Sequence, residues 1–412
     1  MQGMLEGFEA PSTRSADVAR VLVDVDLPHM DRPLDYIVPA GLADAAVVGS
    51  LVRVHLSSAR IDGWIVERIR REVGEGTASL ESVVSSTPVL TPSIYETARR
   101  IAARFLATTS QVLSLAIPPR HARAEREARD ENAPTWPTVT SDRVGLGWEA
   151  YPAGEALVSR LRAGESPRAI ATMLRPRLRG CLSEAVASTV ASRRSVIVVT
   201  ATGEQAGRYA RELSEDLSIP VSLAGSEVAA EKRYRLHVAA SLGRVPVVVG
   251  TRSAVWVPCS RLGLIIIVDD GDDRLRERRF PRCDALDVAV QRCAVEGSGL
   301  LVASSARSVK AQALVRSGWA VGIEPTPQAL REATPRVHLH GSTQAEREGA
   351  GGLMRIPQAA LRMIRGALRS GPVLIQVASA GYWPTVVCRR CEERARCRTC
   401  SGPLSAEADG VV

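Results

Sequence analysis

The sequence predicts an α/β protein in which a small β-rich domain precedes a domain built on a parallel sheet. Between residues 20 and 70, apolar residues alternate or run together in short segments bounded by Pro, Gly and Asp, as strands do. From about residue 155, strand-like apolar runs alternate with helical segments, which is typical of a parallel sheet flanked by helices. A group of cysteines near residue 400 marks a third, Cys-rich region.

The composition is that of a globular protein with hydrophobic cores. The 412 residues are 45% hydrophobic and 24% charged, and a chain of this length usually forms about two to four domains. The longest apolar run, residues 262–268, is far shorter than the roughly 18 residues of a membrane span. The first ten residues lack the basic start and apolar core of a secretory signal. We therefore expect a cytoplasmic protein without membrane contact, whose eight cysteines are thiols or metal ligands.

Basic residues outnumber acidic ones by 53 to 45, and the formal net charge is +8. Only Lys232 and Lys310 are lysines, so nearly all of the positive charge is arginine. This balance suits a polyanionic partner such as nucleic acid, although a codon bias toward arginine also explains part of it. A dense group of arginines can either track phosphates or form a solvated helical face. Its members are Arg160, Arg162, Arg168, Arg175, Arg177, Arg179, Arg193 and Arg194.

The first domain is expected at residues 18–120, after a loose polar tail at 1–17. Strands are predicted at 20–27, 50–56 and 63–69, where they would form a small antiparallel barrel or an open sheet.

A helix is predicted at 92–105, because apolar side chains recur there on one face. Ser93 and Glu96 would form a capping box at its start. Residues 121–154 mix charges, Pro and Gly without a period, and we expect a linker there.

The parallel-sheet domain is expected at residues 155–340, and a further region at 355–412 begins with a helix at 357–370 and a strand at 371–378. Within the parallel-sheet domain, the predicted strands are 195–200, 245–251, 262–268 and 299–305, and the predicted helices are 203–217, 284–296 and 308–317.

A parallel sheet invites a nucleotide-binding interpretation, but the phosphate loop is missing. A loop of the form Gly-x4-Gly-Lys-Ser/Thr supplies backbone N–H groups and a lysine to the phosphates. Neither lysine has that context, because Lys232 follows Glu and Lys310 follows Val. After the strand at 262–268, Asp269, Asp270 and Asp272 occupy the place where NTPases hold magnesium. Without the loop, a solvated acidic turn explains them better, and we assign no catalytic residue.

Four cysteines form the pattern C-x2-C-x5-C-x2-C: Cys388, Cys391, Cys397 and Cys400. Each pair can present two thiolates to zinc, so the pattern is a strong metal signature. The five-residue spacer is shorter than the roughly 12–20 residues between the halves of one zinc ribbon. Either both pairs fold onto one strained site, or further ligands come from elsewhere, since residues 401–412 hold no Cys or His.

Several stretches resemble the PriA family of replication-restart proteins, also called primosomal protein N′, from about residue 20 to 404. The most specific stretches are 32–39, 247–258, 262–273, 303–306 and Gly381-Tyr382-Trp383-Pro384. The resemblance implies an N-terminal domain that holds a DNA 3′ end, then a RecA-like helicase lobe, then the start of a second lobe with an insertion that binds two zincs. It also implies forked and single-stranded DNA, primosome proteins and replicative-helicase loading proteins as partners.

In this family a pocket for the 3′ end matches Leu34, Asp35, Tyr36 and Gly49, with Arg60 nearby. An aromatic ring can stack on a terminal base, and a carboxylate can accept a hydrogen bond from a terminal hydroxyl. Without the resemblance, Asp35 and Tyr36 would be interpreted as turn residues.

The chain departs from the family where the motor should be. The phosphate-loop lysine has no counterpart, the family's Asp-Glu-Glu-His is Asp-Asp-Gly-Asp at 269–272, and its Ser-Ala-Thr is Ser-Ala-Arg at 305–307. Phosphoryl transfer depends on those groups. We expect a DNA-binding replication-restart protein that does not use ATP and holds zinc weakly, because in the family four later cysteines complete its two zinc sites. The alternatives are an ATP-dependent 3′–5′ helicase with an unrecognised phosphate site and an inactive truncated product.

Overall fold

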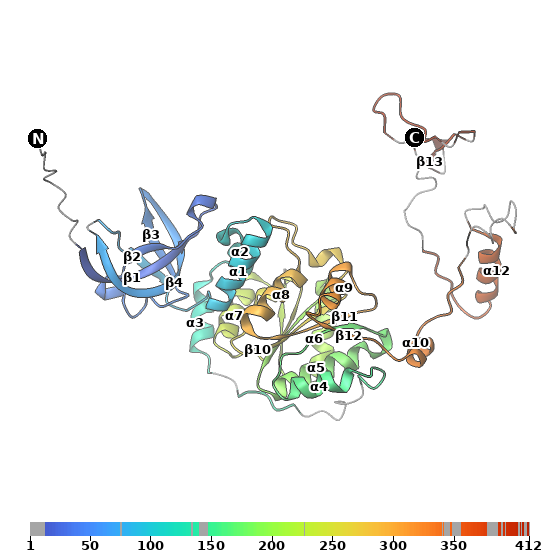
Figure 1. The fold of residues 1–412 in the computed structure, drawn as a ribbon, viewed down its shortest axis with the longest axis horizontal. Helices are drawn as coiled ribbons and strands as arrows, with labels where there is room; N and C mark the ends of the chain where they lie inside the picture. Colours follow the sequence, from blue (N-terminus) through green and yellow to red (C-terminus); the bar gives the residue numbers. More distant parts are fainter. Residues whose placement is uncertain are drawn as a thin grey trace, which may run out of the picture. The chain divides into compact units, whose positions relative to one another are not determined.

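The computed structural model divides the chain into two compact units, Met1–Thr334 and Pro335–Val412. Figure 1 follows the ribbon from the blue N-terminal sheet, through the green and yellow parallel-sheet domain, to the orange and red C-terminal part. The described residues are 13–74, 76–132, 135–139, 147–225, 227–339, 341, 347, 356–376, 386–388, 390–391, 393–402, 404, 406–407 and 410–411.

The first unit begins with a five-stranded antiparallel sheet of strand order β2-β1-β4-β3-β5. Its elements are β1 (Thr13–Val23), η1 (Pro28–Met30), β2 (Leu34–Ile37), η2 (Ala40–Leu42), β3 (Leu51–Leu56), β4 (Ala59–Gly74) and β5 (Ser82–Ser85). The three predicted strands are confirmed, but the tail predicted at 1–17 is wrong from Thr13 onward. These polar residues belong to β1 because they pair with the long strand β4, from Thr13 opposite Gly74 to Val23 opposite Gly63.

Three helices follow the sheet: α1 (Pro92–Phe105), α2 (Thr109–Ala116) and α3 (Ala122–Asp130). The predicted first helix is confirmed, but its N-cap is Thr91, whose hydroxyl accepts from the Ile94 N–H. The capping box of Ser93 and Glu96 is wrong, because the Glu96 carboxylate instead pairs with arginines one turn later.

Helix α3 lies inside the segment for which the sequence predicts a linker. Its small residues Ala124 and Ala128 are fully buried, and their 3.6-residue spacing is hidden in the sequence by the charged residues around them. The buried carboxylate of Glu125 ties the N-terminal sheet to the next domain, since it accepts from the Ser85 hydroxyl at 2.7 Å and from the Tyr234 hydroxyl at 3.1 Å.

The rest of the first unit is a seven-stranded, all-parallel sheet of order β12-β6-β11-β10-β7-β9-β8. Its strands are β6 (Arg168–Thr172), β7 (Ser195–Val199), β8 (Val221–Ala224), β9 (Val247–Gly250), β10 (Leu262–Val268), β11 (Gly299–Ser304) and β12 (Val321–Ile323). The helical elements are α4 (Gly154–Arg162), η3 (Arg175–Arg177), α5 (Leu178–Ala191), α6 (Gly203–Leu217), α7 (Ala230–Ser241), η4 (Arg252–Trp256), η5 (Asp273–Leu275), α8 (Ala285–Glu296), α9 (Val309–Arg316) and α10 (Pro327–Ala333).

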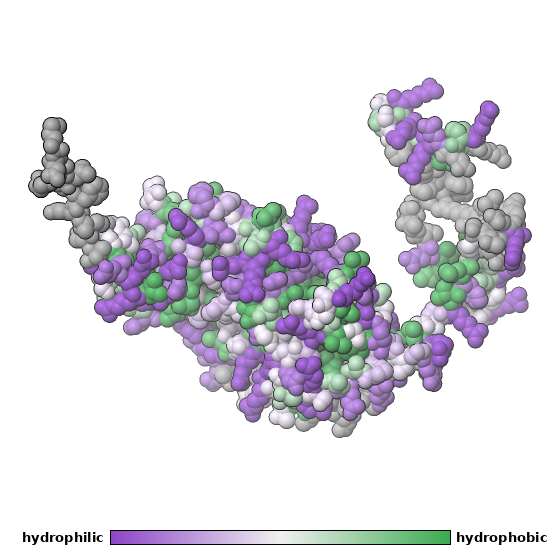
Figure 2. Space-filling view, viewed as in Figure 1, coloured by the Kyte–Doolittle hydropathy of each residue, from purple (hydrophilic) through white to green (hydrophobic). Residues whose placement is uncertain are grey.

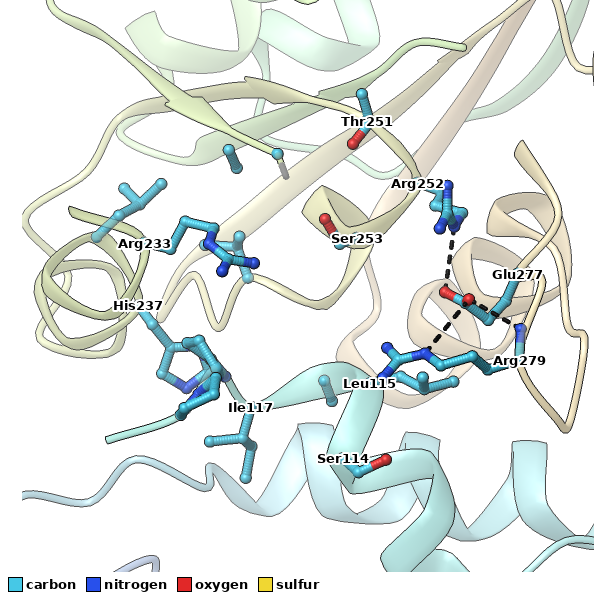
Figure 3. A pocket seen from close by; sticks show the side chains of 17 residues that line it. Ser114, Leu115, Ile117, Arg233, His237, Thr251, Arg252, Ser253, Glu277 and Arg279 are labelled. Atoms are coloured by element: carbon cyan, nitrogen blue, oxygen red, sulfur yellow. Dashed lines mark hydrogen bonds and ion pairs between the residues drawn. The ribbon is translucent and has the colours of Figure 1, made fainter. Parts of the chain in front are cut away.

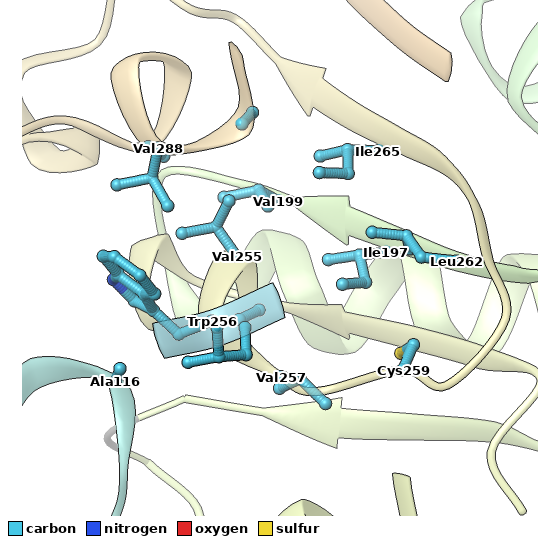
Figure 4. Close-up of a cluster of buried hydrophobic side chains, with 14 of the residues drawn as sticks. Ala116, Ile197, Val199, Val255, Trp256, Val257, Cys259, Leu262, Ile265 and Val288 are labelled. Carbon is cyan, nitrogen blue, oxygen red and sulfur yellow. The ribbon is translucent and has the colours of Figure 1, made fainter. Parts of the chain in front are cut away.

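The two faces of this sheet bury separate cores, because side chains alternate along each strand. Ile197 and Val199 of β7 face the core that contains α1, α2, α7 and α8, and Figure 4 shows them beside Val255, Trp256 and Val288. Val198 faces the other core, beneath α4, α5 and α6. All seven strands and helices predicted for this domain are confirmed, whereas β6, β8 and β12 are short and give no strong pattern.

The second unit contains α12 (Gln358–Ala367), β13 (Ala406–Glu407) and β14 (Gly410–Val411). The helix predicted at 357–370 is confirmed. The strand predicted at 371–378 is wrong for residues 371–376, which form no strand, and its last two residues lie outside the described residues. Among the residues that the structure describes, no helix is long and apolar enough to cross a membrane.

Candidate nucleic-acid interface

Asp35 and Tyr36 are neighbours in β2, yet their side chains lie on opposite faces of the N-terminal sheet. Tyr36 belongs to the inner core and is 3% exposed. The side chain of Asp35 is 29% exposed and contacts other charged residues. This is the alternation of any strand, and it divides the predicted pocket residues into an outer and an inner set.

A charged cluster surrounds Asp35 on the outer face. Arg71 Nη1 donates to Asp35 Oδ2 at 2.7 Å, and Arg20 Nε lies 3.6 Å from Asp35 Oδ1. Arg20 is the direct cross-strand neighbour of both Asp35 and Glu67, and its Nη1 donates to Glu67 Oε2 at 2.8 Å. Opposite charges that face one another across strands stabilise the sheet modestly. In the space-filling view, hydrophilic side chains alternate with smaller apolar patches over the visible face of the N-terminal sheet (Figure 2).

Tyr36 anchors β2 in the core of the N-terminal sheet. Its hydroxyl donates to the backbone carbonyl of His55 at 3.1 Å, and burial raises its pKa. Leu34 is partly buried against the same core. The expectation that the Tyr36 ring stacks on a terminal base does not fit this burial, because the ring offers no exposed face.

Gly49 also has a structural role. Its φ is +90°, a conformation that costs little for glycine alone, and a Cβ here would lie 2.4 Å from the carbonyl oxygen of Leu90. Its N–H donates to the Ile65 carbonyl at 2.7 Å. The glycine therefore lets the segment before α1 pass against the sheet.

Arg60 lies at the β3–β4 hairpin, where its side chain is 69% exposed. Arg60 and His55 are cross-strand partners, and both contact Glu81, at 3.1 Å and 3.0 Å. Because Tyr36 reaches the His55 carbonyl, this hairpin is connected to β2 through the core. Among the described residues, no hydrogen bond or ion pair joins Arg60 to Asp35 directly.

The three carboxylates of the acidic motif after β10 accept hydrogen bonds from other side chains of this protein. Asp269 accepts from Arg175 at 2.9 and 3.0 Å, and Asp270 accepts from the Ser304 hydroxyl at 2.7 Å. Asp272 caps η5 and pairs with Arg274, whose hydrogen bond lowers the pKa of the Asp272 carboxyl.

The pairing of Arg175 with Asp269 was not predicted from the sequence. Arg175 lies in the turn between β6 and α5. In parallel sheets, ligands bind beyond the carboxyl ends of the strands, and phosphates bind at the start of the following helix. This turn reads Arg175-Pro176-Arg177 and is separated from the end of β10 by one strand, β11. The strand order that reveals it is not visible in the sequence.

A cavity of about 360 Å³ lies beyond the ends of β8 and β9, against the end of α2. In Figure 3 the guanidinium groups of Arg252 and Arg279 lie beside Glu277, with Arg233 on the far side of the cavity. Arg252 Nε donates to Glu277 Oε2 at 3.1 Å. Burial opposes the ionisation of Glu277, but the Arg279 N–H and the Arg252 guanidinium outweigh it and lower its pKa.

In each cysteine pair, backbone N–H groups of following residues donate to the first thiol. The N–H groups of Arg390 and Cys391 lower the pKa of Cys388, and those of Cys400 and Thr399 lower the pKa of Cys397 to about 7. Such hydrogen bonds favour thiolates, the form that binds metal. In the described part of the chain, no three His, Cys, Asp or Glu side chains are grouped as metal ligands. The stretch 381–384 that supports the resemblance lies outside the described residues.

The remaining cysteines, Cys181, Cys259, Cys283 and Cys293, are buried. Burial raises the pKa of each thiol, to about 11 for Cys293 and about 12 for the other three. They are therefore core residues.

Residues 20–118 match the 3′DNA-binding domain (3′BD) of PriA. The chain is 38% identical over 394 residues to the probable replication restart protein PriA of Mycobacterium tuberculosis, covering 94% of this chain and 59% of that protein. For the Mycobacterium leprae protein of the same name, identity is 35% over 389 residues, with 92% and 59% covered. This chain thus spans about 59% of the length of these relatives.

Among solved structures, RecG bound to a three-way DNA junction matches with a TM-score of 0.31 and 14% identity over 57% of this chain and 29% of that chain. A match at this level supports no conclusion about function. The domain match and the relatives agree with each other, since both point to PriA. Over nearly its whole length, the chain is therefore similar to the PriA replication restart proteins, and its residues 20–118 match their 3′DNA-binding domain.

Proposed function

We propose that this chain is a DNA-binding replication-restart protein that recognises forks with an accessible 3′ end and helps to reload the replicative helicase without a motor of its own. The observation that carries the proposal is the match of residues 20–118 to a 3′DNA-binding domain. The partly exposed carboxylate of Asp35 on the outer face of that domain supports it, since a carboxylate can accept a hydrogen bond from a terminal hydroxyl.

The absence of motor activity is supported by the acidic motif. A helicase needs a lysine on the nucleotide phosphates and a carboxylate on magnesium. Here Arg175 occupies the turn after β6 and pairs with Asp269, the first carboxylate of the motif. ATP is therefore not expected as a cofactor.

The partners follow from the same similarity to PriA. Forked and single-stranded DNA would be bound by the N-terminal domain. Primosome and helicase-loading proteins would assemble on the DNA-bound form in the cytoplasm. The +8 net charge supports the nucleic-acid part of this proposal.

We propose four cysteines as zinc ligands: Cys388, Cys391, Cys397 and Cys400. Each pair would offer zinc two thiolates, and we expect weak binding. A structural zinc site needs four ligands, and each pair supplies two.

Titration with labelled forks tests the DNA function. We expect tighter binding to a fork that ends in a 3′-hydroxyl than to one that ends in a 3′-phosphate. Asp35→Ala should reduce that preference. It should leave the affinity for duplex DNA nearly unchanged, because that affinity comes from arginines that contact the phosphate backbone. Asp44→Ala is the matched control, since Asp44 is an exposed carboxylate of the same domain. Equal affinity for both forks in the wild-type protein, unchanged in Asp35→Ala, would contradict the proposal.

A further inference from the structure

The carboxylate of Asp35 is one half of an ion pair. Arg71, on β4, donates from Nη1 to Asp35 Oδ2 at 2.7 Å, and the side chain of Arg71 is 51% exposed. The two residues are 36 positions apart in the sequence and meet because β1 lies between their strands in the sheet. A guanidinium that donates to one carboxylate oxygen forms a charge-assisted hydrogen bond, which is stronger than a neutral one and favours this position of the carboxylate.

Arg71 keeps unused hydrogen-bonding capacity. A guanidinium has five N–H donors, and among the described residues Asp35 is the hydrogen-bond and ion-pair partner that the structure shows for Arg71. On the other side of Asp35, Arg20 Nε has no hydrogen-bond partner, although it lies 3.6 Å from Asp35 Oδ1. The cluster therefore offers a carboxylate acceptor beside the exposed guanidinium of Arg71, whose remaining donors have no partner in the described part of the chain.

We propose that Arg71 is a specificity-determining residue of the 3′-end site, where it holds Asp35 in place and donates its remaining N–H groups to the last phosphodiester of the strand. This inference rests on the proposed function. A 3′-terminal nucleotide carries a hydroxyl that donates to a carboxylate and, on its 5′ side, a phosphate that accepts from a guanidinium. The Arg71–Asp35 pair presents the two complementary groups side by side.

The pairing explains how a carboxylate can serve in a site for a polyanion. An isolated Asp35 would repel the phosphodiester next to the hydroxyl that it binds, whereas the adjacent guanidinium attracts that phosphate. A 3′-phosphate would bring a second anionic group toward the Asp35 carboxylate and would be rejected. Arg71 thus adds affinity for the strand and, by holding Asp35, maintains the discrimination of the strand end by that carboxylate.

The test compares Arg71→Gln with Arg70→Gln. Arg70 is the neighbouring exposed arginine of β4, and strand alternation places it on the other face of the sheet from Arg71. For Arg71→Gln we expect about tenfold weaker binding to the 3′-hydroxyl fork, the loss that corresponds to one charge-assisted hydrogen bond. The ratio of affinities for 3′-hydroxyl and 3′-phosphate forks should also fall, because Asp35 loses the group that holds it. The slope of log K against log salt should become shallower by about 0.7 to 0.9, the value for one lost phosphate contact. For Arg70→Gln, the ratio of affinities for 3′-hydroxyl and 3′-phosphate forks should stay that of the wild type.

Arg71→Lys separates charge from geometry. Lysine should restore the salt slope but not the end preference, because an ammonium cannot hold a carboxylate and a phosphate in one plane as a guanidinium does. Thermal unfolding of each variant checks that the domain is folded.

If Asp35→Ala abolishes the end preference while Arg71→Gln behaves like Arg70→Gln, this inference is overturned and the proposed function stands. Full recovery of the preference in Arg71→Lys would also overturn the proposal that one guanidinium contacts both Asp35 and the last phosphodiester. If neither Asp35→Ala nor Arg71→Gln changes the preference, the proposed function fails with it.

Discussion

Both carboxylate oxygens of Asp269 accept hydrogen bonds from one nitrogen of Arg175, at 3.0 and 2.9 Å, although the residues are 94 positions apart. The contact joins the turn before α5 to the end of β10, across the edge of the sheet where a nucleotide would bind. An internal cation therefore neutralises the carboxylate that a motor would use for magnesium. Because the pair is partly exposed, it adds little to the stability of the fold. Its main effect is that Arg175 occupies the carboxylate of Asp269.

We predict no DNA-stimulated ATP hydrolysis by this chain. The turn after β6 has Arg175-Pro176-Arg177 in place of a glycine-rich loop with lysine, and Asp269 is already paired. A steady-state ATPase assay with forked DNA measures this, and Asp269→Asn should leave the background rate unchanged. Turnover near 1 s⁻¹ or above, within the range typical of enzymes, would falsify the prediction.

We predict weak or substoichiometric zinc in the 412-residue chain. Each cysteine pair provides two thiolates, and the described residues offer no group of three or more ligands. Metal analysis after dialysis against a mild chelator should find less than one zinc per chain, and Cys397→Ser should lower it further. Retention of two zincs per chain after this dialysis would refute the prediction.

Replacing Gly49 by alanine should destabilise the N-terminal sheet. Its φ of +90° and the 2.4 Å approach to the Leu90 carbonyl leave no room for a Cβ. A strained non-glycine backbone costs about 1–3 kcal/mol before any clash is counted. Urea unfolding should therefore show a lower free energy of unfolding, whereas Gly41→Ala, where a Cβ meets nothing within 4 Å, should be nearly neutral. Equal stability of the two variants would count against this role of Gly49.

Acidification should destabilise the protein partly through His237. This side chain is fully buried and contacts the Val89 carbonyl through Nε2 at 2.7 Å, and burial lowers its pKa from 6.5 to about 4. In the unfolded chain the ring takes up a proton near pH 6.5, whereas in the folded chain it does so near pH 4. Its contribution is therefore fully present above pH 6.5 and is lost as the pH falls from 6.5 toward 4.

The matched variant is His237→Gln, which keeps a neutral donor for the Val89 carbonyl. Between pH 7 and pH 4.5, the wild-type free energy of unfolding should fall by about 2–3 kcal/mol more than that of the variant, as expected for a shift of this size. Parallel curves for the two proteins would show that His237 does not carry this pH dependence.

Local patterns in the sequence determined much of the architecture. The apolar run at 262–268 is β10, residues 203–217 are α6, and 92–105 are α1, because strand and helix periodicity depends on neighbouring residues. The missing phosphate loop was equally readable, since it is a contiguous motif. Helix α3 was missed because its buried apolar residues are two alanines among charges, and their burial depends on the partner helix α7.

The tertiary structure alone decided how the candidate residues act. Tyr36 is internal and Asp35 external because the rest of the sheet covers one face of β2, which no local pattern specifies. Arg71 meets Asp35, and Arg175 meets Asp269, because strands distant in sequence are neighbours or near neighbours in the two sheets. Periodicity describes which side of an element is apolar, but the partner of a charged side chain depends on strand order, which is set by packing of the whole chain.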